Sequence, residues 1–333
     1  MRRMRTAKVG IDYSRDKANI CVLFGAKRYD ECFANTPTSG PELLKWLKDT
    51  TGSKRFDIVF EPTGRYSELL SEYLWLQKNV RMYQVNPEQV SHYQKSIDLR
   101  NQTDVKAGYA LSRYAVERSD ILKEWSPKTH VHKELRDIQM LMRSTNKRIV
   151  ALKCQLKCGI RFRYVEEEIQ EELKRLEEQK ERWLDVATKI IKSDESLTKD
   201  LELLDSIPGI AERTAVLLLC FIDFRSFRTS RALAAFLGLT VRKKESGTSV
   251  KDKERLCKKG TKHIRAGLFC PIWSSLRGIP ELQQFYDRLT AAGKHAHLAQ
   301  AACMRKVVTI AWSLIRDQRP FDPNYTNPHF KPI

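Results

Sequence analysis

The sequence predicts an α/β domain followed by a long helical spacer and a mostly helical domain. Short β-branched or aromatic stretches alternate with segments of helical spacing in the first part. From about residue 135 the apolar positions step by three and four instead, and from residue 201 the helical segments are short and broken by Gly and Pro. These changes of periodicity, with a length of 333 residues, place the boundaries at 1–125, 126–200 and 201–333.

The elements of the first domain follow from residue type. Strands are expected where β-branched and aromatic residues cluster, in "KVGIDYS", "NICVLF", "FDIVFEPTG" and "VRMYQVN". Helices are expected in "PELLKWLKD" and "SELLSEYLWLQ", and a further helix in "TDVKAGYALSRYA", which Asp104 opens.

The spacer carries a heptad-like apolar pattern between Leu135 and Ile190, with Glu and Lys dense between the apolar positions. Such a pattern predicts a seam between long helices. The seam serves dimerisation, an antiparallel hairpin, or simple packing of a helical spacer on its own chain.

In the third part, "SIPGIAERTA" predicts two helices joined by a Pro-Gly turn, similar to a helix-hairpin-helix. The backbone N–H groups of such a turn, here around Gly209, are suited to bind a phosphate. Any helix pair can also turn on Pro-Gly, so this motif by itself is weak.

The charge of the chain favours a nucleic-acid partner. Lys and Arg number 60 against 41 Asp and Glu, which gives a net charge of +19 and a pI near 9.6. Residues 242–265 hold ten basic and three acidic residues, which indicates a surface that follows phosphates. The candidate phosphate-binding side chains are Lys243, Lys244, Lys251, Lys253, Arg255, Lys258, Lys259, Lys262 and Arg265.

A membrane is not an expected partner. The longest apolar run, residues 215–222, is too short to cross a bilayer, and no apolar segment follows the basic residues at the start of the sequence. The eight cysteines form no CxxC pair, so reduced thiols in the cytoplasm are the simplest interpretation.

Three carboxylates are candidates for one metal site. Asp12 lies in or just after the first expected strand, Glu61 ends another, and Asp104 opens a helix. Acids at the ends of adjacent strands can converge, and carboxylate oxygens suit Mg²⁺, which assists phosphoryl transfer. Each acid alone is better explained as a helix cap or a surface residue.

A patch of hydroxyls interrupts the basic run in "KKESGTSVKD". It is either a solvated loop or a nucleophile held against a phosphate, and the residues alone leave Ser246, Thr248 and Ser249 as equal candidates.

The chain resembles the recombinases of the insertion sequences of family 110, the DEDD-type transposases that use a bridge RNA. The matching stretches are "VGID", "FEPTGRY", "LRNQTD", "SIPGIAERTA", "AAFLGLTVRKKESGTSV", "KKGTKHIRAGL" and "MRKVV", which occur in the order of the family from residue 8 to about 320. The resemblance implies a ribonuclease-H-like (RuvC-like) first domain and a serine transposase domain at the end of the chain.

By this resemblance, Ser246 is the nucleophile and Asp12, Glu61 and Asp104 are the first three acids of a magnesium site. The fourth acid of the family falls on Ala107, so the metal site is incomplete. Because the other motifs are intact, we interpret the chain as a deliberately inactivated variant; natural loss of the acid is the alternative.

The resemblance also implies the function. Guide (bridge) RNA pairs with donor DNA and target DNA, and strands are exchanged through a phosphoserine intermediate in a magnesium-assisted composite active site. We expect a homodimer or homotetramer in the bacterial cytoplasm, associated with the nucleoid. A RuvC-type structure-specific nuclease and a non-catalytic nucleic-acid scaffold are the alternatives.

Overall fold

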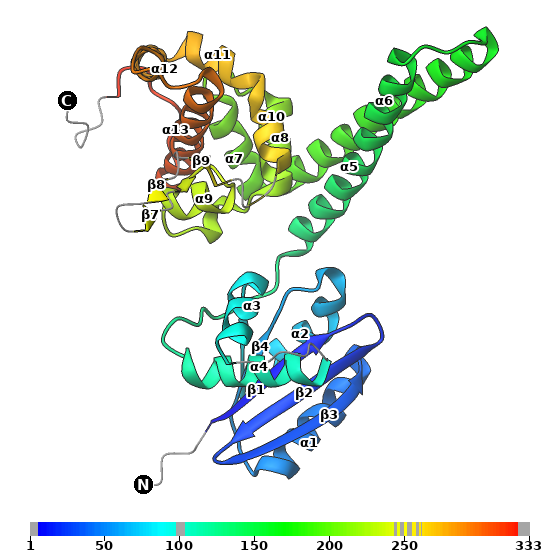
Figure 1. Cartoon of the computed structure of the whole chain (residues 1–333), viewed down its shortest axis with the longest axis vertical. Coiled ribbons are helices and arrows are strands. Elements are labelled where there is room, and N and C mark those ends of the chain that lie inside the picture. Colours follow the sequence, from blue (N-terminus) through cyan, green and yellow to red (C-terminus); the bar gives the residue numbers. More distant parts are fainter. Residues whose placement is uncertain are drawn as a thin grey trace. The chain divides into compact units, whose positions relative to one another are not determined.

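A computed structural model describes residues 6–97, 104–242, 245–246, 250–251, 255–257, 260 and 262–325. The chain forms two compact units, Met1–Lys128 and Thr129–Ile333, and each is described by itself (Figure 1). The long helices of the expected spacer belong to the second unit.

The first unit is built on a five-stranded sheet with the order β3-β2-β1-β4-β5. The strands are β1 (Ala7–Tyr13), β2 (Lys17–Phe24), β3 (Lys27–Ala34), β4 (Phe56–Phe60) and β5 (Val80–Gln84). The first three strands pair antiparallel, whereas β4 runs parallel to both β1 and β5. This mixed sheet is consistent with the ribonuclease-H-like fold that was expected.

Helices cover both faces of this sheet (Figure 1). One face packs on α1 (Gly40–Thr51) and α2 (Glu68–Trp75), and the other on α3 (Pro87–Ser96) and α4 (Asp104–Glu117). Consecutive residues of β4 face the two cores, since Ile58 packs with the first pair of helices and Val59 with the second. The helix that the sequence predicts from Asp104 is confirmed.

Helix α4 crosses β1 at two glycines. A Cβ on Gly10 would lie 2.1 Å from the carbonyl oxygen of Gly108, and a Cβ on Gly108 would lie 3.3 Å from the carbonyl oxygen of Asn19. Because only hydrogen fits at the first contact, the helix backbone lies directly on the sheet at the middle of β1.

The edge strand β3 was not predicted from the sequence. Its stretch "KRYDECFA" carries four charged residues and is mostly exposed. Charged side chains are typical of edge strands, where they oppose pairing with another chain, so the strand lacks the apolar signal that identified its neighbours.

The second unit begins with a helical hairpin made of α5 (His130–Lys157) and α6 (Arg163–Ser193). The two helices are antiparallel, since Thr145 bonds Gln179 and Arg148 pairs with Glu172 at 2.6 Å. The apolar seam of the spacer therefore packs within its own chain. Of the three interpretations, the structure shows the antiparallel hairpin. The buried seam positions are Leu135, Ile138, Met142, Ile149, Leu176, Leu184, Ala187 and Ile191.

The remainder of the second unit is mostly helical and packs around α13 (Ala296–Asp317). The helices before it are α7 (Glu195–Asp205), α8 (Glu212–Phe221), α9 (Ser230–Phe236), α10 (Lys262–Phe269), α11 (Pro271–Gly278) and α12 (Pro280–Ala291), with four two-residue strands between α9 and α10. Among the described residues, α13 is long and apolar enough to cross a bilayer. Most of it is buried inside the unit, and Val307, Val308 and Ala311 are core residues.

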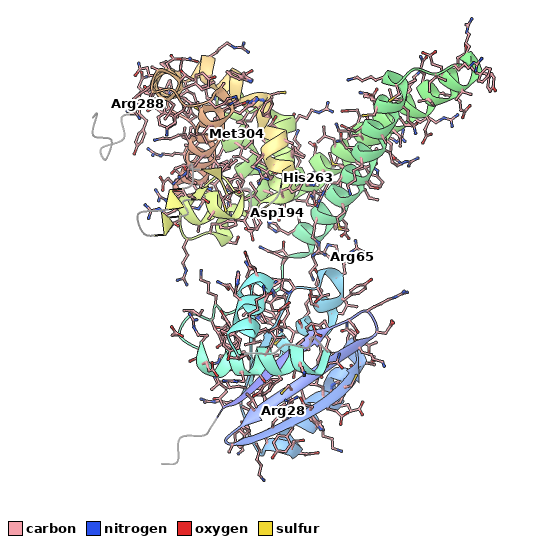
Figure 2. All side chains as sticks on the ribbon, viewed as in Figure 1. Arg28, Arg65, Asp194, His263, Arg288 and Met304 are labelled. Atoms are coloured by element: carbon pink, nitrogen blue, oxygen red, sulfur yellow. The ribbon has the colours of Figure 1, made fainter. Side chains whose placement is uncertain are left out.

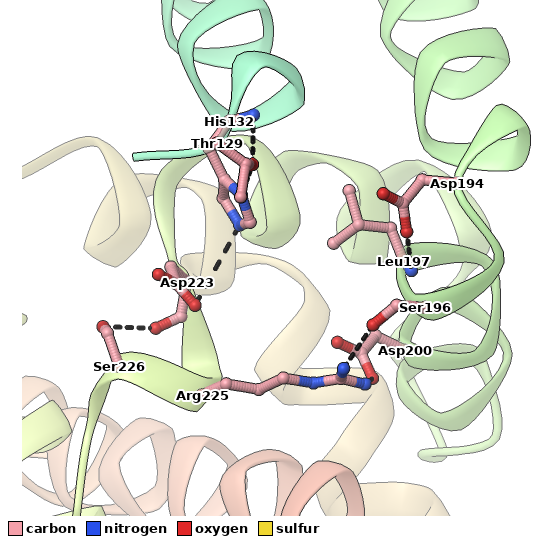
Figure 3. Close-up of polar contacts among 9 residues, drawn as sticks. All are labelled: Thr129, His132, Asp194, Ser196, Leu197, Asp200, Asp223, Arg225 and Ser226. Carbon is pink, nitrogen blue, oxygen red and sulfur yellow. Dashed lines mark hydrogen bonds and ion pairs between the residues drawn. The ribbon is translucent and has the colours of Figure 1, made fainter. Parts of the chain in front are cut away.

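A polar network fixes the base of the hairpin to the helices after it (Figure 3). His132 Nε2 of α5 lies 4.0 Å from an Asp223 oxygen, while the Arg225 guanidinium donates to Asp200 on α7 at 2.7 Å. Asp200 is 3% exposed, and this burial raises the pKa of its carboxyl group. The hairpin and the C-terminal helices therefore share one core and one network.

Candidate metal and nucleic-acid site

Asp12 and Glu61 lie at the same edge of the sheet. Ile11 pairs with Phe60 in the parallel β1–β4 ladder, so Asp12 and Glu61 are the next residue on each strand. Burial, with a further contribution from the negative charge of Asp12, raises the pKa of Glu61 to about 7. The two carboxyl groups are therefore close enough to interact, as the sequence predicts for acids at adjacent strand ends.

A second acid on β4 has a different environment. Asp57 is 3% exposed, and its carboxylate accepts from Lys8 Nζ at 2.6 Å and from Arg81 Nε at 2.8 Å. Among the described residues no cation pairs with Glu61 in this way. A cation is thus supplied by the protein at one end of β4 and not at the other.

Asp104 and Ala107 belong to the first turn of α4. The side chain of Asp104 lies outside the described part of the structure. Its position is one turn before Gly108, whose Cα lies against Asn19 on the sheet. Ala107 is half-buried and offers no oxygen ligand.

The strand register adds one residue that the sequence analysis missed. Asn19 of β2 is paired directly with Asp12 of β1, so the two side chains emerge on the same face of the sheet. An amide oxygen there is a further possible oxygen ligand. To identify Asn19 one must know the register in which β1 pairs with β2. The sequence pattern alone does not give this register.

The donor set fits a divalent cation. Burial and the nearby charge of Asp12 disfavour the ionised form of Glu61, and a hard cation with oxygen ligands would relieve this cost. No cluster of three or more His, Cys, Asp or Glu is present among the residues whose side chains are described. The described acids of the site are therefore Asp12 and Glu61.

Ser246 lies in a small β-ladder of the second unit. Strand β7 (Glu245–Ser246) pairs antiparallel with β8 (Val250–Lys251), with Ser246 opposite Val250. Strand β6 (Val241–Arg242) pairs with β9 (Arg255–Leu256) on either side of it in the sequence. The hydroxyl-bearing stretch is thus flanked by strands.

Several of the predicted phosphate-binding residues lie outside the described residues: Lys243, Lys244, Lys253, Lys258 and Lys259. For Ser246, Lys251, Arg255 and Lys262 only the backbone is described. The guanidinium of Arg265 donates to the carbonyl oxygen of Leu237 at 2.8 Å.

Gly209 has a packing role that the sequence did not reveal. It follows Pro208 between α7 and α8 with a φ of +85°, and a Cβ there would lie 2.4 Å from the amide nitrogen of Ser275. Pro208 in turn lies where a Cβ on Gly278 would clash. The turn therefore packs closely on α11, which by itself requires glycine at this position.

Comparisons with known proteins agree with this architecture. Residues 9–164 match the family DEDD_Tnp_IS110, described as a transposase, and residues 201–287 match the "Transposase IS116/IS110/IS902 family". The chain is 27% identical over 329 residues to the "Pilin gene-inverting protein" of Moraxella bovis, covering 96% of this chain and 98% of the relative. The protein of the same name from Moraxella lacunata matches equally.

A shorter match is found to the "Insertion element IS110 uncharacterized 43.6 kDa protein" of Streptomyces coelicolor. It is 31% identical over 116 residues, which is 34% of this chain and 28% of that protein. Since both matched families describe IS110 transposases and their matches include the strand-end acids of the first unit and the Ser246 ladder of the second, the chain belongs to the IS110 family of transposases.

Proposed function

We propose that this IS110-family transposase is a metal-dependent, RNA-guided DNA recombinase that uses Ser246 as its nucleophile. The observation that carries the proposal is the pair Asp12 and Glu61, two carboxyl groups at one sheet edge with the pKa of Glu61 raised to about 7. The two Moraxella relatives are named for inverting a gene, and inversion is a recombination of DNA.

Asp12, Glu61 and Asp104 would hold Mg²⁺, with Asn19 beside them. When bound, the cation neutralises charge that develops on a phosphate during transfer and lowers the pKa of a coordinated oxygen. The parallel ladder of β1 and β4 fixes the backbone positions of Asp12 and Glu61. These two acids would therefore determine where the cation binds.

Ser246 would attack the phosphorus of a DNA phosphodiester. The Oγ–P bond forms, the bond from phosphorus to the leaving deoxyribose oxygen breaks, and that oxygen takes up a proton. The proton of the serine hydroxyl goes to a nearby proton-accepting group that acts as general base. A second deoxyribose hydroxyl then reverses these changes and releases the serine, so the energy of the phosphodiester bond is kept and no ATP is needed.

Guidance by an RNA follows from the resemblance to bridge-RNA recombinases, and the net charge of +19 supports a large polyanionic partner. A homodimer or homotetramer is proposed on the same resemblance. The buried hairpin seam supplies no separate argument for association, because its apolar residues pack within one chain.

The nucleophile is tested by trapping the covalent intermediate. Ser246→Ala should abolish the protein–DNA adduct and leave affinity for RNA and DNA within about twofold, since phosphate contacts dominate that affinity. Ser249→Ala is the matched control and should retain the adduct. An adduct that survives Ser246→Ala and disappears in Ser249→Ala would refute the assignment, and cleavage without any adduct would favour a RuvC-type nuclease.

The role of position 107 is tested by restoring an acid. Ala107→Asp places a carboxylate three residues after Asp104, on the same side of α4, and should increase joined product per hour under saturating RNA and Mg²⁺. A chain that forms no product with either residue would favour a non-catalytic nucleic-acid scaffold. Equal rates would show that the fourth acid is dispensable and that Ala107 is a natural feature.

A further inference from the structure

A cavity of about 350 Å³ opens in the second unit, on one side of α13. Its floor is formed by buried residues, Leu239, Gln300, Ala301 and Met304, and Met304 is labelled on α13 in Figure 2. Its rim carries planar groups, and the remaining lining residues are Leu256, Arg265, Ala266, Phe269, His297 and Leu298. A volume of this size suits a flat organic group.

Gln300 is the buried polar group of this cavity. It is 1% exposed, and its Nε2 donates to the carbonyl oxygen of Phe269 at the end of α10 at 2.8 Å. That bond fixes the orientation of the carboxamide. Within the described part of the chain its Oε1 accepts no hydrogen bond, and a buried acceptor without a donor is costly and uncommon.

The chemistry of the rim selects the kind of donor. The rings of Phe269 and His297 lie with their centroids 5.9 Å apart, and the half-buried guanidinium of Arg265 is held in the wall by its bond to Leu237. Aromatic rings and a guanidinium are the groups on which nucleobases stack. Gln300 Oε1 needs a hydrogen-bond donor, and the N–H groups at the edge of a nucleobase can supply one.

The cavity also lies at the basic segment of the chain. Leu256, which lines it, ends β9, and β9 pairs with β6 to enclose the stretch that contains Ser246. The segment from residue 242 to residue 265 holds ten basic and three acidic residues. A nucleic-acid strand bound to this segment for its phosphates would have its bases within reach of the cavity.

We propose that this cavity receives one unpaired nucleobase with an exocyclic amino group, whose N–H donates to Gln300 Oε1 while the base contacts Phe269 and His297. The proposal rests on the nucleic-acid function proposed above. An amino group is favoured over thymine, because the N3–H of thymine is flanked by two carbonyl oxygens that would approach Oε1 with the same partial charge. Pockets of this kind read bases that have left the stack.

The test uses full-length protein and a single-stranded oligothymidylate of twelve nucleotides with one central 8-azido-deoxyadenosine. Ultraviolet cross-linking followed by peptide mapping should place the adduct in residues 262–269 and 296–304. Gln300→Met should reduce this cross-link about tenfold, because base contacts supply it, while affinity measured by anisotropy changes less than twofold, because phosphates dominate. Ala301→Phe, which fills the cavity, should act in the same way.

Gln139→Met is the matched control, since Gln139 is a buried glutamine of α5 outside the cavity. It should leave the cross-link unchanged, and thermal melting confirms that each variant is folded. A cross-link of equal yield in Gln300→Met, or one that maps elsewhere, would overturn the proposal. Failure of the wild-type chain to bind any oligonucleotide would instead refute the nucleic-acid function itself.

Discussion

Asp57 in β4 and Glu61 directly after that strand show how two carboxyl groups close together in sequence can have opposite environments. Asp57, near the start of the strand, is buried between Lys8 and Arg81 at 2.6 and 2.8 Å. Glu61, directly after its end, is partly buried and has Asp12 as its neighbour, and burial first and the charge of Asp12 second raise its pKa to about 7. The protein neutralises the charge of Asp57 itself, whereas no cation pairs with Glu61 among the described residues.

This difference separates stability from function in the first unit. Removal of one member of a buried ion pair destabilises the folded state, because the charges that remain lose their partner. Two acids placed side by side oppose folding and are retained where a site needs them. Substitutions at Asp57 and Glu61 should therefore have opposite consequences.

The largest effect is expected from Glu61→Gln on recombination. The test is made in the Ala107→Asp background, where activity is expected. Amide and carboxylate have the same shape, but the amide lacks the charge that binds a cation, so joined product per hour should fall by about a hundredfold to a thousandfold. Glu42→Gln, an exposed position on α1, is the matched control and should be neutral. Retention of activity within threefold in Glu61→Gln would remove Glu61 from the metal site.

The next largest effect is expected from Asp57→Ala on folding. Loss of the carboxylate leaves the partly buried Lys8 and the Arg81 guanidinium without their shared partner, so the free energy of unfolding should fall by about 3 kcal/mol. Asp30→Ala removes an exposed pair with Arg28 and should cost under about 1 kcal/mol. Equal losses in urea denaturation would contradict the distinction drawn between the two pairs.

Much of the first unit was predictable because its central strands β1 and β4 are largely buried on both faces. The four expected strands and the helix from Asp104 appear in the structure, since runs such as "FDIVF" leave little alternative to a central strand. Strand β3 was missed because it is a charged edge strand, and without it the sheet order was not available.

The candidate site was predictable in its acids and not in its surroundings. Placement at strand ends was sufficient for Asp12 and Glu61, whereas the neighbour of Asp12 on β2, Asn19, depends on the register of two strands. The contact of Gly10 with Gly108 is likewise a property of three-dimensional packing. The spacer pattern left three interpretations open because heptad spacing does not show whether the second helix belongs to the same chain.

A smaller effect is expected from pH on the metal-free protein. The folded pKa of Glu61 is about 7, above the usual 4.5, so folding binds a proton in this range. The stability that this proton provides is fully present below about pH 4.5 and is lost as the pH rises through 7. Glu61→Gln cannot titrate, so its stability relative to wild type should increase by about 2 kcal/mol between pH 4.5 and pH 8 in EDTA. A difference that is independent of pH in urea denaturation would show that the pKa of Glu61 is not raised in the folded protein.

The smallest effect is expected from Ala107→Asp on the stability of the metal-free protein. It is the most direct test of whether further acids join Glu61 at this sheet edge. A fourth carboxylate beside the proposed site adds repulsion, and Asp has a lower helix propensity than Ala, although the first turn of α4 favours a negative charge. These contributions partly cancel, so the free energy of unfolding in EDTA should fall by under about 1 kcal/mol.

In saturating Mg²⁺ the Ala107→Asp variant should instead be more stable than wild type, because a ligand that binds the folded state more tightly stabilises it further. Ala107→Asn is the control, because the Asn side chain has the shape of Asp without its charge. This variant should lose stability in EDTA, and Mg²⁺ should stabilise it no more than it stabilises wild type. If Asp and Asn respond alike to Mg²⁺ in thermal melting, position 107 does not face the cation and the acids at the ends of β1 and β4 act without it.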